Sequence, residues 1–167
     1  MKNKESFGIE DMMLDSGSVG YKGSILEGIL NKLFYQKSST TFCLSNFVAV
    51  GANYDIPFDT ILANIGDNFY ISGSGKITAK RECKVMVSAT IWMYASERCW
   101  LFLKKNNANL TSVIGKSGAD SYTSLTFAPF IVQMNAGDYL TIKNTVYCEY
   151  SNGSNTGKTT YITLQEL

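Results

Sequence analysis

The chain has 167 residues, the length of one domain with a short appendage. Apolar residues make up 45% of it, charged residues only 17%, and 15 basic residues nearly balance 14 acidic ones. This balance argues against nucleic acid or an anionic lipid surface as the main partner. The low charged fraction indicates that additional surface is buried in an oligomer.

The sequence contains no histidine. It therefore lacks the commonest general base, the commonest metal ligand and the partner of most serine and cysteine nucleophiles, which argues against an enzyme. We expect no cofactor and no metal site. The four cysteines, Cys43, Cys83, Cys99 and Cys148, do not have the spacing of paired zinc ligands. We expect them to be reduced thiols packed as small apolar residues.

The first residues, MKNKESFGIEDMMLD, have no apolar run of signal-peptide length. No stretch reaches the roughly 20 apolar residues that a spanning helix needs, so we expect no membrane insertion. The sequence therefore predicts a protein that is made and kept soluble, without export by an ordinary signal.

Residues 1–40 are predicted to form an arm with one amphipathic helix. Ser24 and Glu27 have the spacing of a capping box, in which each side chain satisfies a free backbone N–H at a helix start. The apolar residues that follow recur at helical spacing and form one stripe: Ile25, Leu26, Ile29, Leu30, Leu33 and Phe34. A helix this short needs something to pack on. Its own domain is one choice, and a docking or oligomerisation contact is the prediction we carry forward.

Residues 41–167 have the alternating pattern of apolar and polar residues that is typical of an all-β domain. In KVMVSATIWMYA the odd-numbered residues from Val85 to Met93 form one apolar face, while the even-numbered ones mix polar and large amphipathic groups. This alternation predicts a strand with one face in a core and the other against a partner layer. CWLFLKKNNANLTSVIGK predicts a hairpin that turns at its asparagines.

Further strands are predicted on either side of the turn at 135–138. In the second of them Leu140, Ile142, Val146 and Cys148 are expected to share one face, and TTYITLQEL is expected to close the chain as a strand. Eight or more short strands with Gly and Asn turns predict an antiparallel sandwich or jelly roll.

The order of these strands resembles the jelly-roll family of tumour necrosis factor and the globular heads of the complement recognition protein. It is most similar to the versions of this fold in bacteriophage virion proteins. Three stretches within residues 41–167 carry the likeness: FYISGSGKITAKRECKVMVSATIW, the hairpin LFLKKNNANLTSVIG, and NAGDYLTIKNTVY followed by the closing strand. The resemblance implies a homotrimer in which one face of each sandwich is buried along a threefold axis.

Aromatic residues make up 13% of the chain, which is a large share for one small core. Trp92, Tyr94, Tyr139 and Tyr147 lie opposite the apolar stripes of their predicted strands. Such rings suit interfaces, where the ring is buried and its polar tip finds a partner. We predict that these four residues form the trimer interface; the alternative is that they meet a second layer of the same chain.

Residues 153–160 read GSNTGKTT, which is close to a phosphate-binding loop. That loop needs four residues between its first Gly and the Gly-Lys pair, and here Gly153 and Gly157 enclose only three. It also needs a helix to follow, whereas TTYITLQEL predicts a strand. The sequence therefore predicts a polar turn rather than a nucleotide site.

Loops rich in Asn, Ser, Tyr and Lys supply adaptable hydrogen bonds beside rings that can stack on sugars, and function often sits on such loops. The candidate residues for a surface ligand are Asn106, Asn107, Tyr122, Tyr150, Asn152 and Asn155. Solvated turns have the same composition, so both readings stay open.

The predicted function is that of a non-enzymatic bacteriophage virion protein. It would form a homotrimeric knob, held to capsid or tail proteins through residues 1–40 and in contact with a glycan or receptor of the bacterial surface. The alternative is a soluble cytokine-like or lectin-like ligand, which would require export and oxidised cysteines. A hydrolase or nucleotide-binding enzyme would have to work without histidine and with a defective loop.

Overall fold

The computed structural model describes residues 37–118, 121–153 and 159–167. The chain divides into two units, Met1–Gln36 and Lys37–Leu167, and all described residues belong to the second. The strands are β1 (Ser39–Cys43), β2 (Val48–Val50), β3 (Thr60–Ile65), β4 (Phe69–Ser72), β5 (Lys76–Ala79), β6 (Cys83–Tyr94), β7 (Cys99–Lys105), β8 (Ala108–Gly115), β9 (Thr123–Met134), β10 (Tyr139–Asn144), β11 (Cys148–Tyr150) and β12 (Tyr161–Glu166). The helix expected over Ile25 to Phe34 lies outside the described residues.

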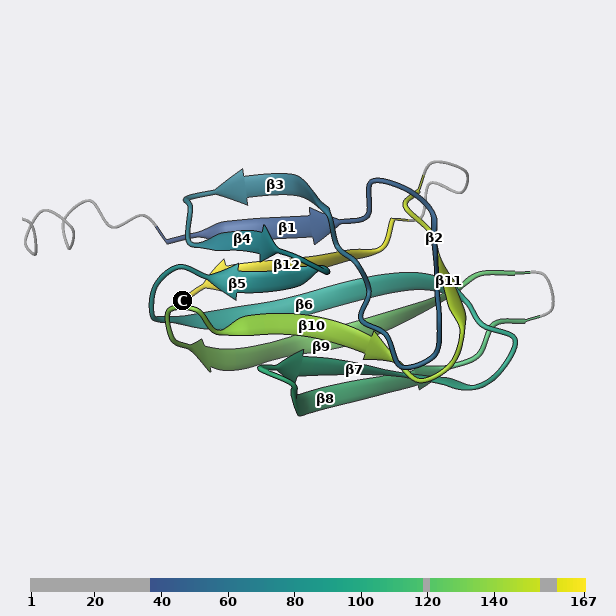
Figure 1. The fold of residues 1–167 in the computed structure, drawn as a ribbon. Coiled ribbons are helices and arrows are strands. Elements are labelled where there is room, and N and C mark those ends of the chain that lie inside the picture. Colours follow the sequence, from purple (N-terminus) through teal and green to yellow (C-terminus); the bar gives the residue numbers. More distant parts are fainter. Residues whose placement is uncertain (1–36, 119–120, 154–158) are drawn as a thin grey trace, which may run out of the picture. The chain divides into compact units, whose positions relative to one another are not determined.

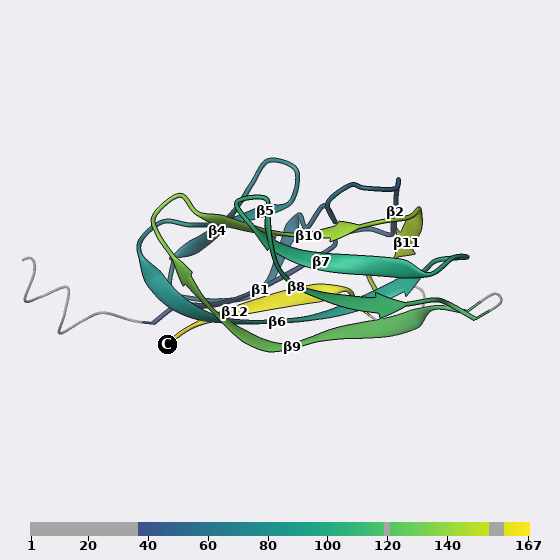
Figure 2. The same ribbon diagram turned by 90° about the horizontal axis from the view of Figure 1, so that it is seen from below.

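The strands form two antiparallel sheets that lie face to face (Figures 1 and 2). One has seven strands in the order β2-β11-β6-β12-β1-β3, with β9 on the other side of β6. The second has five strands in the order β4-β5-β10-β7-β8. The predicted all-β antiparallel sandwich is confirmed.

Strand β6 lies inside the seven-stranded sheet, with β9 on one edge and β12 and β11 on the other. Its odd-numbered residues from Val85 to Met93 are no more than 2% exposed. The even-numbered residues from Met86 to Tyr94 are half-buried on the opposite face. The alternation predicted from KVMVSATIWMYA is therefore confirmed.

The side chains between the sheets form one apolar core. Both sheets contribute fully buried side chains to it, among them Phe42, Ile91 and Met134 from the seven-stranded sheet and Ile77, Leu101 and Leu140 from the five-stranded sheet. Ile56 and Phe58, from the segment between β2 and β3, are buried with them. Burial of this kind is the main favourable contribution to folding.

The predicted hairpin over 99–116 is formed by β7 and β8, which pair from Cys99–Gly115 to Lys105–Ala108. They turn at Asn106 and Asn107, whose φ angles are 48° and 70°. Asparagine enters this left-handed region more readily than most residues, because its short polar side chain bonds locally.

The strand expected over 139–150 is instead two strands in different sheets. β10 ends at Asn144 in the five-stranded sheet, and β11 begins at Cys148 in the seven-stranded sheet. The Asn144 side chain holds this crossing: its Oδ1 accepts the Tyr54 N–H at 3.0 Å and its Nδ2 donates to the Val50 carbonyl at 3.4 Å. The apolar alternation continues through the crossing, so the sequence pattern does not reveal it.

Substitutions of Gly75 in the β4–β5 turn and of Gly137 in the β9–β10 turn test how tightly these two turns are packed. Both have positive φ, 74° and 84°. A Cβ on Gly75 would lie 2.6 Å from the Ile56 carbonyl oxygen and 2.7 Å from the Phe58 nitrogen, whereas a Cβ on Gly137 would meet no atom within 4 Å. Gly137→Ala should lower the free energy of unfolding by about 1–2 kcal/mol, the cost of the left-handed backbone. Gly75→Ala should cost roughly 1–3 kcal/mol more, because packed backbone must move.

Urea denaturation of the two variants beside the wild type measures this difference. Equal losses would show that the segment 56–58 does not pack against the β4–β5 turn.

Candidate functional site

The face of the seven-stranded sheet that points away from the core carries almost no charge. Strand register places alternate residues of β3, β1, β12, β6 and β9 on it. We call this surface the outer face, and its residues are Thr60, Ala63, Ile65, Ser39, Thr41, Cys43, Tyr161, Thr163, Gln165, Lys84, Met86, Ser88, Thr90, Trp92, Tyr94, Ser124, Thr126, Ile131 and Gln133. Its charged residues lie at two ends: Lys84 near one end of β6, and Glu149 of β11, which pairs with Tyr94 and so belongs to the same face.

Hydroxyl side chains occupy the middle of the outer face. Ser88, Thr90 and Thr163 are half-buried, and the Thr41 and Thr163 hydroxyls lie 2.9 Å apart. A sheet face that meets water normally alternates apolar residues with strongly polar ones. Depletion of charge, with aromatic and methionine side chains nearby, is instead the composition of a subunit interface.

Both edges of this sheet expose apolar side chains. On β3, Ile61, Leu62 and Ile65 are 47%, 61% and 55% exposed, and on β9 Phe130 and Ile131 are 37% and 52% exposed. Within the described part of the chain, β3 pairs only with β1 and β9 only with β6. An unpaired apolar edge is a surface on which another chain can pack.

The four aromatic residues predicted for the interface do not lie together. Trp92 and Tyr94 are on the outer face. Tyr139 belongs to the five-stranded sheet, where the Lys76 ammonium lies 4.6 Å from the centre of its ring. Tyr147 lies in the connection between β10 and β11 and is 52% exposed.

Tyrosines gather around Glu149 at one end of the outer face. The rings of Tyr94 and Tyr122 are 6.3 Å apart, and the Tyr147 hydroxyl donates to Glu149 Oε1 at 3.1 Å. That hydrogen bond raises the pKa of Tyr147, and burial followed by the Glu149 charge raises the pKa of Tyr122. Both shifts favour the protonated hydroxyl, and that of Tyr147 is the donor to Glu149.

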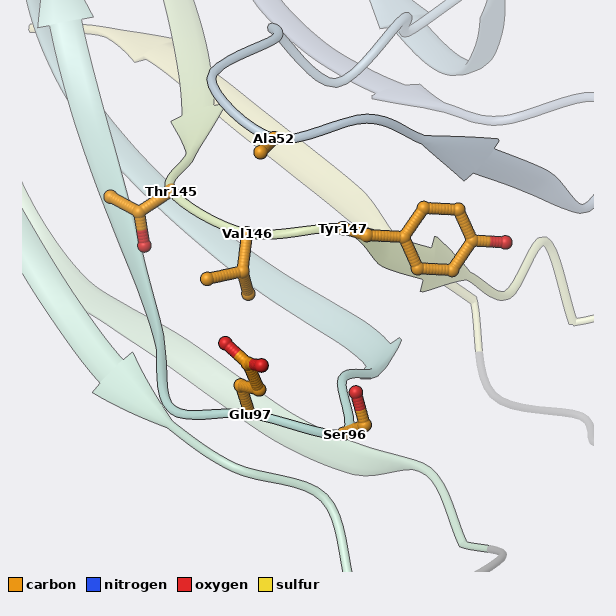
Figure 3. A pocket seen from close by; sticks show the side chains of 6 residues that line it. All are labelled: Ala52, Ser96, Glu97, Thr145, Val146 and Tyr147. Atoms are coloured by element: carbon orange, nitrogen blue, oxygen red, sulfur yellow. The ribbon is translucent and has the colours of Figure 1, made fainter.

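A pocket of about 240 Å³ opens at the same end, where the β6–β7 loop meets the β10–β11 connection (Figure 3). Its lining residues are Ala52, Ser96, Glu97, Thr145, Val146 and Tyr147. In Figure 3 the Glu97 carboxylate and the Val146 side chain point toward each other. Of this set, only Tyr147 was predicted from the sequence as a site residue, because the pocket joins three segments far apart in the chain.

Several of the predicted surface-ligand residues have structural contacts. The Asn106 side chain donates to Asp138 at 2.6 Å and accepts the Tyr139 N–H at 3.0 Å, so it joins two turns. Asn152 Nδ2 donates to the Ser45 carbonyl at 2.9 Å. Asn107 is exposed at the hairpin tip. Asn155 lies outside the described residues.

Tyr150 was predicted on a surface loop, and this prediction is wrong. It is the last residue of β11, pairs with Met93 of β6 and is fully buried. Its side chain points into the core because Tyr150 and Met93 share the inner face of the sheet. The sequence places Tyr150 just before the polar stretch SNGSNTGKTT, which makes a core residue look like part of a loop.

The structure bears on the predicted turn at GSNTGKTT, of which residues 154–158 lie outside the described ranges. Asn152 and Thr159 form an isolated antiparallel bridge. The segment that follows is strand β12, as predicted, and not the helix that a phosphate-binding loop requires.

Within the described ranges no cluster of three acidic or cysteine side chains could hold a metal ion. No helix in the same ranges is long and apolar enough to cross a membrane.

The sequence matches no described protein family, and no curated protein matches it in sequence. Solved structures do match. The tumour necrosis factor Eiger from S. frugiperda superposes with a TM-score of 0.64 at 16% identity, over 78% of this chain and 92% of Eiger. Murine APRIL superposes with a TM-score of 0.64 at 11% identity, over 79% of this chain and 100% of APRIL. The globular domain of zebrafish complement 1qA superposes with a TM-score of 0.56 at 14% identity, over 79% of this chain and 97% of that domain.

The fold is a jelly roll of the tumour-necrosis-factor type. The predicted fold class is thereby confirmed. At these sequence identities the likeness concerns the fold, and function has to be argued from the surfaces described above.

The Asp138 carboxylate gives a pH-dependent test of the turn that Asn106 joins. Asp138 Oδ2 lies 2.7 Å from Lys105 Nζ and accepts the Asn135 N–H at 2.8 Å. These bonds, that of Lys105 first, lower the pKa of Asp138 from 3.8 to about 2. A lowered folded-state pKa adds stability above the unfolded-state pKa, and that stability is lost as the pH falls from about 4 toward 2.

Asp138→Asn should therefore lower the free energy of unfolding by about 1–2 kcal/mol at pH 6, after allowance for solvent screening. The difference from wild type should shrink toward pH 2. Denaturation curves at pH 6, 4 and 2.5 measure it, and a pH-independent difference would show that the carboxylate charge does not stabilise this turn.

Proposed function

We propose that the chain forms a cyclic homotrimer through the outer face and its two apolar edges. The observation that carries the proposal is the near absence of charge on a sheet face that the described chain leaves uncovered. The low charged fraction of the whole sequence, 17%, points the same way.

The two edges differ from each other, which favours a ring over a twofold dimer. β3 offers Ile61, Leu62 and Ile65, and β9 offers Phe130 and Ile131. A contact in which the β9 edge of one copy packs on the outer face of the next, toward its β3 edge, joins unlike surfaces. Heterologous contacts of this kind close into rings when the rotation allows. Three copies is the number implied by the resemblance of the sequence to trimeric jelly-roll proteins.

We further propose that this trimer is a non-enzymatic knob of a bacteriophage virion. The N-terminal unit, residues 1–36, would dock it on capsid or tail proteins, since residues 39 and 40 of the predicted arm belong to β1. The loop end with Tyr122, Tyr147 and the pocket would meet a glycan or receptor of the bacterial surface. Support comes from the resemblance of three sequence stretches to phage virion jelly rolls, and from a chain that divides into an N-terminal unit and a sandwich.

A second candidate is a soluble cytokine-like ligand. The observation that favours it is the superposition on Eiger and murine APRIL, over 78% and 79% of this chain. Particle association separates the two candidates, because a cytokine-like ligand would be found free and a virion knob would copurify with capsid or tail proteins.

Ile131→Lys tests the interface. Burial of an unpaired ammonium there should weaken each subunit contact by roughly 2–4 kcal/mol, enough to yield monomers at micromolar concentration. Tyr70→Lys is the matched control, because Tyr70 is 40% exposed on β4 at the edge of the other sheet. Light scattering should give one copy for Ile131→Lys and three for the control. Three copies in both variants, each folded by circular dichroism, would contradict the proposed interface.

Removal of residues 1–36 tests the docking role. The cut must spare Ser38, which is buried and whose N–H donates to Glu166 Oε2 at 2.9 Å. The shortened chain should keep its thermal stability and its three-copy assembly but no longer copurify with the particle. Continued particle association would place the docking surface on the sandwich instead.

A further inference from the structure

Two of the four cysteines lie against each other inside the sandwich. The Cys148 and Cys99 sulfurs are 3.3 Å apart, and both side chains are fully buried. A disulfide bond is about 2.0 Å long, so the two sulfurs would have to approach each other by about 1.3 Å to form one. Cys43 and Cys83 are buried as well, but no thiol neighbours either of them among the described contacts.

The pair spans the two sheets. Cys99 opens β7 in the five-stranded sheet, and Cys148 opens β11 in the seven-stranded sheet. Cys148 follows directly on the crossing that begins at Asn144. A bond between the two sulfurs would therefore tie the sheets together at the end where the chain changes sheets.

The hydrogen bond between the two thiols favours the thiolate form of Cys99. The Cys148 thiol donates its hydrogen to the Cys99 sulfur, which lowers the pKa of Cys99 and raises that of Cys148. At Cys83 and Cys43 burial dominates and raises the pKa. Because the thiolate is the reactive form, Cys99 differs from the two unpaired cysteines in the direction that favours attack on a disulfide.

The pocket of Figure 3 lies beside the pair. Ser96 and Glu97 come shortly before Cys99 in the chain, and Thr145 to Tyr147 come directly before Cys148. Val146 lines the pocket, and its carbonyl oxygen lies 3.4 Å from the Cys148 sulfur. The connection from Thr145 to Tyr147 thus lies between the pocket and the Cys148 sulfur. It has no strand pairing, and such a segment opens at lower free energy than the strands beside it.

We propose that Cys99 and Cys148 are a redox modification site, at which a small disulfide of the glutathione type enters through this pocket and converts the two thiols into an inter-sheet disulfide. The Cys99 thiolate attacks one sulfur of glutathione disulfide and releases one glutathione thiolate. The Cys148 thiolate then attacks the Cys99 sulfur of the mixed disulfide and releases the second. In the net reaction the S–S bond of glutathione disulfide breaks and one S–S bond forms in the protein. The two protein thiols lose two electrons and two protons to glutathione disulfide, which becomes two molecules of glutathione. This inference does not depend on subunit association.

Peptide mapping of the full wild-type chain is the first test. The reduced, folded protein is incubated without denaturant in a buffer of glutathione and glutathione disulfide at pH 8, quenched with acid, alkylated and digested. One cross-linked pair of peptides with Cys99 and Cys148 is expected, together with alkylated Cys43 and Cys83. Four alkylated cysteines, or a bridge to Cys43 or Cys83, would overturn the proposal. No variant has to fold for this result.

Thermal unfolding is the second test. The bridge closes a loop of about 50 residues, so the oxidised chain should melt roughly 10 °C above the reduced chain. The double variant Cys43→Ala with Cys83→Ala should keep this shift, and Cys99→Ala with Cys148→Ala should lose it. An unchanged melting temperature of the cross-linked wild-type chain would show that the bond does not tie the sheets.

Discussion

The burial of alternate side chains along β6 is the constraint on which the other features depend. One row, from Val85 to Met93, forms the middle of the core, and this fixes which residues of β12 and β9 face inward through their pairing with β6. The opposite row, from Met86 to Tyr94, must then lie on the outer face. A slip of one residue would exchange the two rows, and it is prevented because only one of them is fully apolar. The outer face is thus a consequence of the core, and its lack of charge is a separate property of the sequence that the core does not require.

The crossing between β10 and β11 brings the remaining features together. Asn144 bonds to the last residue of β2 and to the segment that follows it, and this holds the connection that lines the pocket and places Cys148 beside Cys99. The tyrosines around Glu149 belong to the same end of the molecule. One end of the sandwich therefore combines hydrogen-bond donors, a small cavity and a buried thiol pair, while the outer face offers a surface with few charges. The proposed ligand contact and the proposed subunit contact would use neighbouring surfaces, which meet at Tyr94.

The strands that alternate strictly could be predicted, and the strands that do not could not. The pattern of β6, the asparagine turn of β7–β8 and the closing strand β12 all follow from local chemistry. β3 was missed because the apolar residues of TILANI stand next to one another and do not alternate with polar ones. In the structure every residue after Thr60 is exposed, so no buried face imposes an alternation on this strand. Tyr150 was misplaced because strand β11 is only three residues long and a polar loop follows it. The pocket and the sulfur pair depend on residues about 50 to 100 positions apart, and no local pattern reports such contacts.

The proposals differ in how far they depend on one another. The subunit contact is central, because a knob or a receptor-binding head needs it, whereas the thiol pair needs only the fold of one chain. Sedimentation equilibrium of the full wild-type chain, from low micromolar to about 100 micromolar, tests this contact most directly. The proposed ring, with the copy number implied by the resemblance to trimeric jelly-roll proteins, predicts a mass of three chains across that range. A mass of one chain at the highest concentration would contradict the account, since the outer face would then be exposed to water in a stable monomer.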